Sequence, residues 1–71
     1  MNLWEELKRI DKISGKTKIK VVLLDESVLV GFYDGYTSSL DNDPPIASID
    51  VRTEDGLYEL YENEIRSIET A

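Results

Sequence analysis

The sequence predicts a mainly β fold, in which an N-terminal α-helix precedes a strongly bent five-stranded antiparallel barrel. Apolar residues recur at helical intervals near the N-terminus and at every second residue from about residue 17 onward. Two glycines, Gly31 and Gly35, interrupt the second predicted strand, and glycines inside strands often mark sharp bends or close backbone approaches. Because strongly bent strands let a short sheet curl into a barrel, we expect a single domain over residues 1–71.

The helix is predicted over about residues 2–14. Asn2 is a suitable N-cap, and Glu5 stands three residues later at capping-box spacing. Glu5 and Arg9 form a favourable i,i+4 pair, and Gly15 suits the left-handed position that ends a helix. We expect the apolar stripe to pack against the sheet rather than to form an interaction face; it consists of Leu3, Leu7 and Ile10.

The predicted strands alternate apolar and polar residues and are separated by turn formers. They cover about residues 17–25, 28–36, 46–53, 57–61 and 65–69. Asp55-Gly56 is the strongest hairpin signal, and the polar run 62–64 predicts a tight turn before the last strand. The predicted core consists of Leu7, Ile10, Ile19, Val21, Leu23, Val30, Ile49, Val51, Leu60 and Ile68.

The composition argues against an enzyme. The 71 residues include no cysteine and no histidine, so the chain lacks a thiolate nucleophile and the commonest metal ligand and neutral-pH base. A domain of this size also has little room for a pocket around its remaining carboxylates. We therefore predict no catalytic activity and no cofactor. Because no disulfide is available to stabilise so small a core, self-association is the expected source of additional buried surface.

Charge is distributed unevenly along the chain, which carries a net charge of -7. Residues 1–24 hold six of the eight lysines and arginines, whereas residues 25–71 hold twelve of the fifteen acids. The acidic majority disfavours general nucleic-acid binding, which depends on neutralising phosphates. No apolar run approaches the roughly 20 residues of a membrane helix, and no signal-peptide pattern is present, so we expect a cytoplasmic protein with no membrane partner.

Residues 40–48, LDNDPPIAS, raise the question of a metal site. Asp41 and Asp43 have the spacing of the first two ligands of a calcium loop. Pro45, Ile46 and Arg52 occupy the positions where such a loop needs a third oxygen ligand, a glycine and a glutamate. We therefore predict a solvated turn that acts as a hinge between strands, with no metal bound.

A local nucleic-acid contact is an alternative for the basic end of the chain. Lys16, Lys18 and Lys20 form a local basic edge, with Lys18 and Lys20 on one face of the first predicted strand, and Tyr33 and Tyr36 lie near the glycine-interrupted stretch. Aromatic side chains beside a basic groove can stack on bases. Tyrosines at such positions more often belong to the core, with the hydroxyl at its rim.

Two stretches, residues 19–41 and 58–69, resemble the two motifs of Sm-like proteins. The first has alternating apolar residues, an acidic turn and Gly31 at the bend, followed by Tyr33 and Tyr36. The resemblance, as a divergent bacterial or phage member, implies an N-terminal helix, a bent five-stranded barrel and a ring of subunits. In that family an aspartate and an asparagine bind an RNA base. The matching positions here are Thr37 and Asp41, and YENE replaces the second motif's Arg-Gly pair. The resemblance therefore does not extend to the RNA-binding site.

Two functional hypotheses remain. The first is a non-catalytic interaction module that forms a homo-oligomer by strand pairing at open barrel edges and that also accommodates a protein partner. Contact between the basic N-terminal third and the acidic remainder would favour head-to-tail assembly. The alternative is binding of RNA or single-stranded nucleic acid by an Sm-like ring, with contacts from Lys16, Lys18, Lys20, Tyr33, Tyr36, Thr37 and Asp41.

Overall fold

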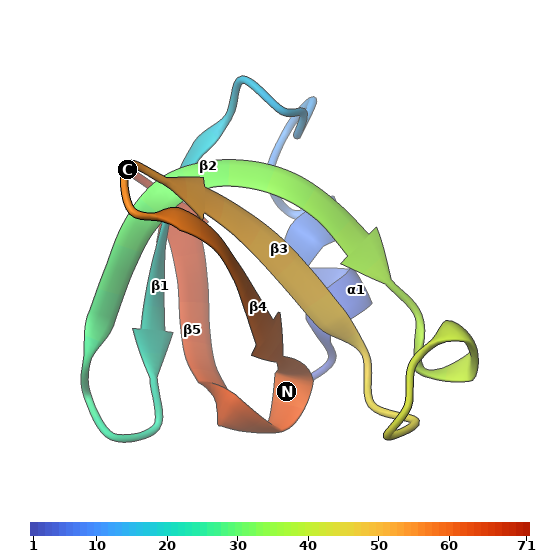
Figure 1. Ribbon diagram of the computed structural model, residues 1–71. Coiled ribbons are helices and arrows are strands. Elements are labelled where there is room, and N and C mark those ends of the chain that lie inside the picture. Colours follow the sequence, from blue (N-terminus) through green and yellow to red (C-terminus); the bar gives the residue numbers. More distant parts are fainter.

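The computed structural model describes all residues 1–71 as one short helix and one five-stranded antiparallel sheet (Figure 1). The strands lie in the order β4-β3-β2-β1-β5. This confirms the predicted mainly β fold with an N-terminal helix. The elements are α1 (Leu3–Lys8), β1 (Lys18–Leu23), β2 (Val28–Thr37), the single 3-10 turn η1 (Ser39–Asp41), β3 (Ser48–Thr53), β4 (Gly56–Tyr61), the 3-10 turn η2 (Glu62–Glu64) and β5 (Ile65–Thr70).

Strand β2 arches across the molecule, and its two glycines permit the arch (Figure 1). A Cβ atom on Gly31 would lie 2.6 Å from the carbonyl oxygen of Arg52 and 2.8 Å from the Val51 Cγ1 atom. Only glycine therefore allows β3 to approach β2 this closely. Gly35 has a φ angle of 143° and follows a shift in the β2–β3 register. The prediction that these glycines mark a close approach and a bend is confirmed.

The sheet curls but does not close into a barrel. β4 pairs only with β3, and β5 pairs only with β1, so both are edge strands. The three residues of η2 join these opposite edges, which brings one end of β4 near one end of β5 (Figure 1). Continuous pairing around a barrel would require a further β4–β5 ladder, and the structure has none. The prediction of a closed barrel is therefore not confirmed, and the five strands form an open, curled sheet.

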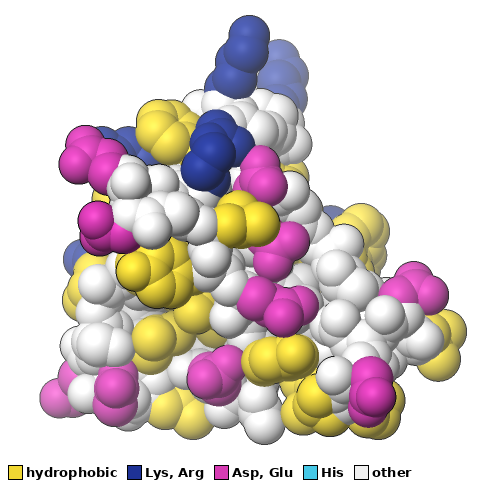
Figure 2. All heavy atoms as spheres, in the orientation of Figure 1, with side chains coloured by type: hydrophobic (Ala, Val, Ile, Leu, Met, Phe, Trp, Pro, Cys, Tyr) yellow, Lys and Arg dark blue, Asp and Glu magenta, His cyan; other side chains and the backbone are white.

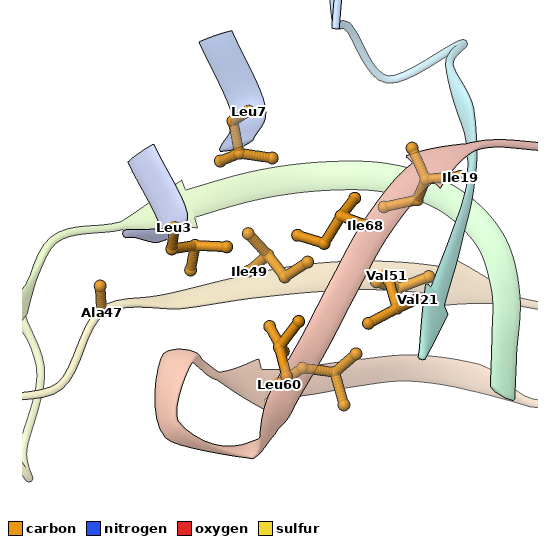
Figure 3. Packing of buried hydrophobic residues seen from close by; sticks show 10 residues of the cluster. Leu3, Leu7, Ile19, Val21, Ala47, Ile49, Val51, Leu60 and Ile68 are labelled. Atoms are coloured by element: carbon orange, nitrogen blue, oxygen red, sulfur yellow. The ribbon is translucent and has the colours of Figure 1, made fainter. Parts of the chain in front are cut away.

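The core lies between the concave face of the sheet and α1. Figure 3 shows Leu3 and Leu7 projecting from the helix toward the side chains of the sheet, and both leucines are buried. Asn2 Oδ1 accepts a hydrogen bond from Glu5 N at 3.1 Å, which confirms the predicted N-cap. The buried apolar residues are Leu3, Leu7, Ile19, Val21, Ala47, Ile49, Val51, Leu60, Ile65 and Ile68.

Seven of the ten predicted core residues are among these buried side chains. Ile10 and Leu23 are partly buried and pack against the cluster. The prediction for Val30 is wrong, because its side chain is 44% exposed. Val30 is the cross-strand partner of Lys20, and directly paired residues project from the same face of a sheet. It therefore lies on the convex face with Lys20.

The helix is much shorter than predicted, because it ends at Lys8 rather than near Gly15. Lys12 has a φ angle of 54°, which is incompatible with a continuing helix. The Thr17 hydroxyl accepts a hydrogen bond from Ser14 N at 2.9 Å, and such local bonds compete with helical ones. The predicted i,i+4 ion pair between Glu5 and Arg9 is replaced by two i,i+3 pairs, Glu5–Lys8 and Glu6–Arg9.

Candidate functional site

The free edge of β4 presents backbone groups that have no partner in the fold. Glu62 N donates to Ala47 O at 2.8 Å, which sets the alternation of the β3–β4 ladder. In an antiparallel pair every second residue directs its N–H and C=O toward the neighbouring strand. Tyr58 and Leu60 therefore face β3, whereas Leu57 and Glu59 direct their backbone groups to the open side.

The free edge of β5 has the same character. Ala71 N donates to Lys18 O at 3.0 Å, so Glu69 and Ser67 direct their backbone groups toward β1. The backbone groups of the intervening residues Arg66, Ile68 and Thr70 consequently point away from the sheet. Both edges are six residues long, and unpaired edges of this kind are templates for another strand.

The two pairs of strands at opposite sides of the sheet differ in the charge of their side chains. Around β3 and β4, the stretch from Ser48 to Tyr61 carries four acids against the single cation Arg52. In the strands β1 and β5, Lys18, Lys20 and Arg66 stand against Glu69, and the connections beside these strands add Asp25, Glu26, Glu62 and Glu64. Lys20 is paired with Glu69 and Arg66 with Glu26. Figure 2 shows acidic side chains running down the middle of the face that β3 and β4 form, with lysines and arginines gathered at its upper end.

Within the acidic region, two carboxylates lie directly opposite each other. Asp50 on β3 is the cross-strand partner of Glu59 on β4. Partial burial raises the pKa of Asp50, and the nearby charges of Glu59 and Asp34 raise it further. Glu59 accepts hydrogen bonds from Ser48 Oγ at 3.0 Å and from the Tyr61 hydroxyl at 3.3 Å. This surface consequently favours the approach of a cation or of a basic surface.

Arg52 ties three parts of the chain together. Its Nη1 donates to Asp34 Oδ1 at 2.7 Å, and its Nη2 donates to Gly15 O at 2.9 Å. The guanidinium carbon lies 5.5 Å from the centroid of the Phe32 ring, within the range of a cation–π contact. Sequence reasoning did not single out this residue for any such role, because its partners lie 18 and 37 positions away.

The predicted nucleic-acid lysines lie on or beside the convex face of β1. Lys18 is the cross-strand partner of Phe32, and Lys20 is the partner of Val30. Lys20 forms an ion pair with Glu69 at 3.5 Å, whereas Lys18 and Lys16 form none. Lys16 is exposed in the loop before β1.

The predicted tyrosines project from the face of the sheet opposite to Lys18 and Lys20. Tyr33 and Tyr36 pack against the core cluster, and the Tyr36 ring lies 5.1 Å from the Trp4 ring of α1. Partial burial is the main cause that raises the pKa of Tyr33. Thr37 pairs with Ser48 at the end of β2, and Asp41 accepts a hydrogen bond from the Ser38 hydroxyl. The aromatic side chain that the structure places beside Lys18 is Phe32.

Residues 38–47, which include most of the LDNDPPIAS stretch, connect β2 to β3. Asn42 Nδ2 donates to Ile46 O at 2.8 Å and to Ser48 Oγ at 2.9 Å, so the asparagine holds the turn together. No cluster of three or more acidic side chains has a geometry that could hold a metal ion. The single α-helix is also far too short and polar to cross a bilayer.

No protein-family model, curated protein or solved structure matches this chain. A functional assignment therefore depends on its own residues, and above all on the two unpaired edges and the opposite charges around them.

Proposed function

We propose that this protein is a non-catalytic interaction module that self-associates head to tail, with β4 of one copy pairing with β5 of the next. In this arrangement the curled sheet is a divergent Sm-like domain, and the strand added by a neighbour continues it. The observation that carries the proposal is the pair of unpaired edges of equal length. Pairing of two different edges leaves a free edge at each end of the growing assembly, which is the condition for a closed ring or an open chain.

The side chains at the edges support the same arrangement. Leu57 and Tyr58 on β4 are 58% and 42% exposed, although both are large and apolar in most of their surface. Tyr58 is the partner of the buried Val51 and lies on the concave side, where an added strand would cover it. Lysines and Arg66 near β5 would then meet the acids near β4, which favours this pairing over β4–β4 or β5–β5 contacts.

Solution mass across a range of concentrations, measured by light scattering after size exclusion, tests the proposal. We expect a defined complex of several copies. Because complementary charges contribute to the contact, added salt should shift the mass distribution toward the monomer. A monomer at every concentration would contradict the proposal.

Edge-blocking variants then locate the contact. Leu57→Pro removes an outward N–H from β4, and Thr70→Pro removes one from β5; neither is expected to disturb the internal ladders. The matched controls Leu57→Thr and Thr70→Val keep the N–H. We expect both proline variants to be monomeric and both controls to assemble, with circular dichroism and Trp4 fluorescence confirming that each variant is folded.

Mixing the two proline variants distinguishes head-to-tail pairing from symmetric pairing. Each variant retains one good edge, so an equimolar mixture should form a one-to-one dimer that neither variant forms alone. If β4 instead pairs with β4, Thr70→Pro alone will dimerise and Leu57→Pro will remain monomeric in the mixture. That result would overturn the head-to-tail arrangement while retaining self-association.

Binding of RNA or single-stranded nucleic acid is the second hypothesis, and its support is narrower. Only Lys18 combines a free charge with an adjacent aromatic ring, that of Phe32, while Lys20 is paired and the tyrosines face the core. It predicts an affinity that falls steeply with salt and is lost when Lys16, Lys18 and Lys20 are changed to glutamate. Fluorescence anisotropy with a labelled oligonucleotide of mixed sequence at low salt is the measurement; no binding would exclude it.

A further inference from the structure

The first half of β2 has a strand on only one side. β1 pairs with β2 along Val28–Phe32, whereas the β3 ladder begins only at Phe32. β3 leaves β2 near the crest of the arch and turns into β4 there (Figure 1). The stretch from Val28 to Gly31 is therefore an open edge inside the sheet, separate from the edges of β4 and β5.

The backbone of this stretch is oriented toward the opening. Leu23 N donates to Ser27 O and Tyr33 N donates to Thr17 O, both at 2.9 Å, which sets the alternation of the β1–β2 ladder. Leu29 and Gly31 accordingly face β1. Val28 and Val30 direct their N–H and C=O groups away from β1, to the side on which no strand lies.

A groove of about 540 Å³ runs along this opening. Leu29, Val30, Gly31 and Phe32 line one side, and the β3–β4 turn, Thr53 to Asp55, lines the other. The outward side chains of this half of β2 are all apolar: Val28, Val30 and Phe32 are 53%, 44% and 39% exposed. A solvated sheet face normally carries polar residues in these positions, as β1 does with Lys18 and Lys20, so the strip on β2 has the composition of a surface that is covered.

The unpaired charges in the groove are negative on balance. Glu54 and Asp55 line it and form no ion pair. The charge of Arg52 is matched by Asp34 at 2.7 Å. Lys18 also lines the groove without an ion pair, so two unpaired carboxylates stand against one unpaired lysine. A ligand strand between β2 and the turn would consequently meet an apolar strip along one flank and two unpaired carboxylates along the other.

We propose that this groove binds an extended peptide from another protein, in which apolar residues alternate with lysine or arginine. The peptide backbone pairs with Val28 and Val30, its apolar side chains cover the strip of Val28, Val30 and Phe32, and its cations reach Glu54 and Asp55. A second folded copy does not supply this segment. The alternating basic and apolar stretch of this chain, residues 16–21, is largely within β1, between β2 and β5.

A capped hexapeptide of alternating valine and lysine is the probe, and the matched hexapeptide of valine and glutamate is its control. Titration into the 15N-labelled full chain, followed by amide spectra and hydrogen exchange, reports on each backbone N–H. We expect the lysine peptide to slow exchange at Val28 and Val30 at least tenfold, and the glutamate peptide to leave it unchanged. Light scattering on the same samples separates this binding from self-association, because the subunit number should not change.

A charge-neutral variant of the β3–β4 turn provides a second test of the proposal. Glu54→Gln/Asp55→Asn removes both groove charges and keeps a turn-forming Asn-Gly pair, so the hairpin is retained. We expect at least tenfold weaker binding of the lysine peptide. Glu5→Gln/Asp11→Asn removes the same number of charges at α1 and the following turn, and should bind like the unchanged chain.

If a peptide binds, three outcomes would overturn the proposal. They are equal binding of the two peptides, protection of Leu57 and Glu59 on β4 in place of Val28 and Val30, and undiminished affinity of the neutral turn variant. The second outcome would place the peptide at the self-association edge. The absence of any spectral change at millimolar peptide would also exclude the groove as a peptide site.

Discussion

The two halves of β2 have similar apolar sequences and opposite surroundings. From Phe32 onward the strand pairs with β3, and its Tyr33 and Tyr36 pack against the core. From Val28 to Gly31 it has only β1 as a neighbour, and its outward valines face solvent. The difference shows that strand hydrophobicity alone does not determine burial. Exposure of apolar residues instead follows the convex face, which Val28, Val30 and Phe32 share, and in the first half of β2 this face borders an unpaired strand edge.

The largest expected loss of stability comes from truncating a side chain that packs beside the covered half of β2. Ile49 is fully buried and is the cross-strand partner of Tyr36. Ile49→Ala should lower the free energy of unfolding by about 2–5 kcal/mol, because it leaves a cavity in the core. Val30→Ala, in the open half, should change it by less than about 0.5 kcal/mol. Urea unfolding of the two variants measures both; equal losses would remove the contrast between the halves.

The junction of the two halves is the next most sensitive point. Gly31→Ala places a methyl group 2.6 Å from the Arg52 carbonyl oxygen, so β3 must move away from β2, at a cost of about 1–3 kcal/mol. Gly35→Ala is the matched control. No atom lies within 4 Å of its added methyl group, so the loss there comes only from the φ angle of 143° and should be about 1 kcal/mol. A larger loss at Gly35 than at Gly31 would contradict the close approach seen at the bend.

Arg52 holds the loop before β1 against the start of the covered half. Arg52→Gln removes the bonds to Asp34 and Gly15, and it should lower stability by about 0.5–1 kcal/mol, since both charged groups are well exposed. Arg66→Gln, which removes a single exposed bond to Glu26, should have almost no effect. Thermal unfolding in low and high salt compares the two variants. A loss of stability for the Arg66 variant as large as that for the Arg52 variant would contradict this role of Arg52.

The smallest expected effect is a gain in stability at Asp50, on β3 beside the covered half of β2. The pKa of Asp50 is raised by burial and by Glu59, so the folded protein disfavours its carboxylate at neutral pH. Asp50→Asn should therefore raise stability by about 0.2–1 kcal/mol at pH 7. Since the penalty exists only above the unfolded value of 3.8, the gain should shrink as pH falls through the raised folded value and vanish below 3.8. Thermal melts from pH 3 to 7 test this, and a pH-independent gain would exclude the electrostatic cause.

Local chemistry predicted much of the fold. Period-two alternation located all five strands to within two residues at each end, and Asp55-Gly56 located the hairpin. The alternation also predicted that Lys18 and Lys20 lie on one face of β1 and that Ile19 and Val21 lie on the other, as observed. The helix end was not predictable in this way. The Ser14–Thr17 turn competes with the helix locally, and the bond from Arg52 to Gly15 that anchors it spans 37 residues.

The sequence by itself determined which segments are strands, where β2 bends and which faces of β1 and β3 are apolar, because these properties depend on neighbours one to four residues apart. Only the tertiary structure decided that the sheet remains open, that Phe32 rather than a tyrosine lies beside Lys18, and that Val30 is exposed. The start of β2 is apolar on both faces, so alternation there cannot identify the buried one. The choice depends on the register of β1 and on the point where β3 leaves β2, and both are set by contacts between residues far apart in the chain.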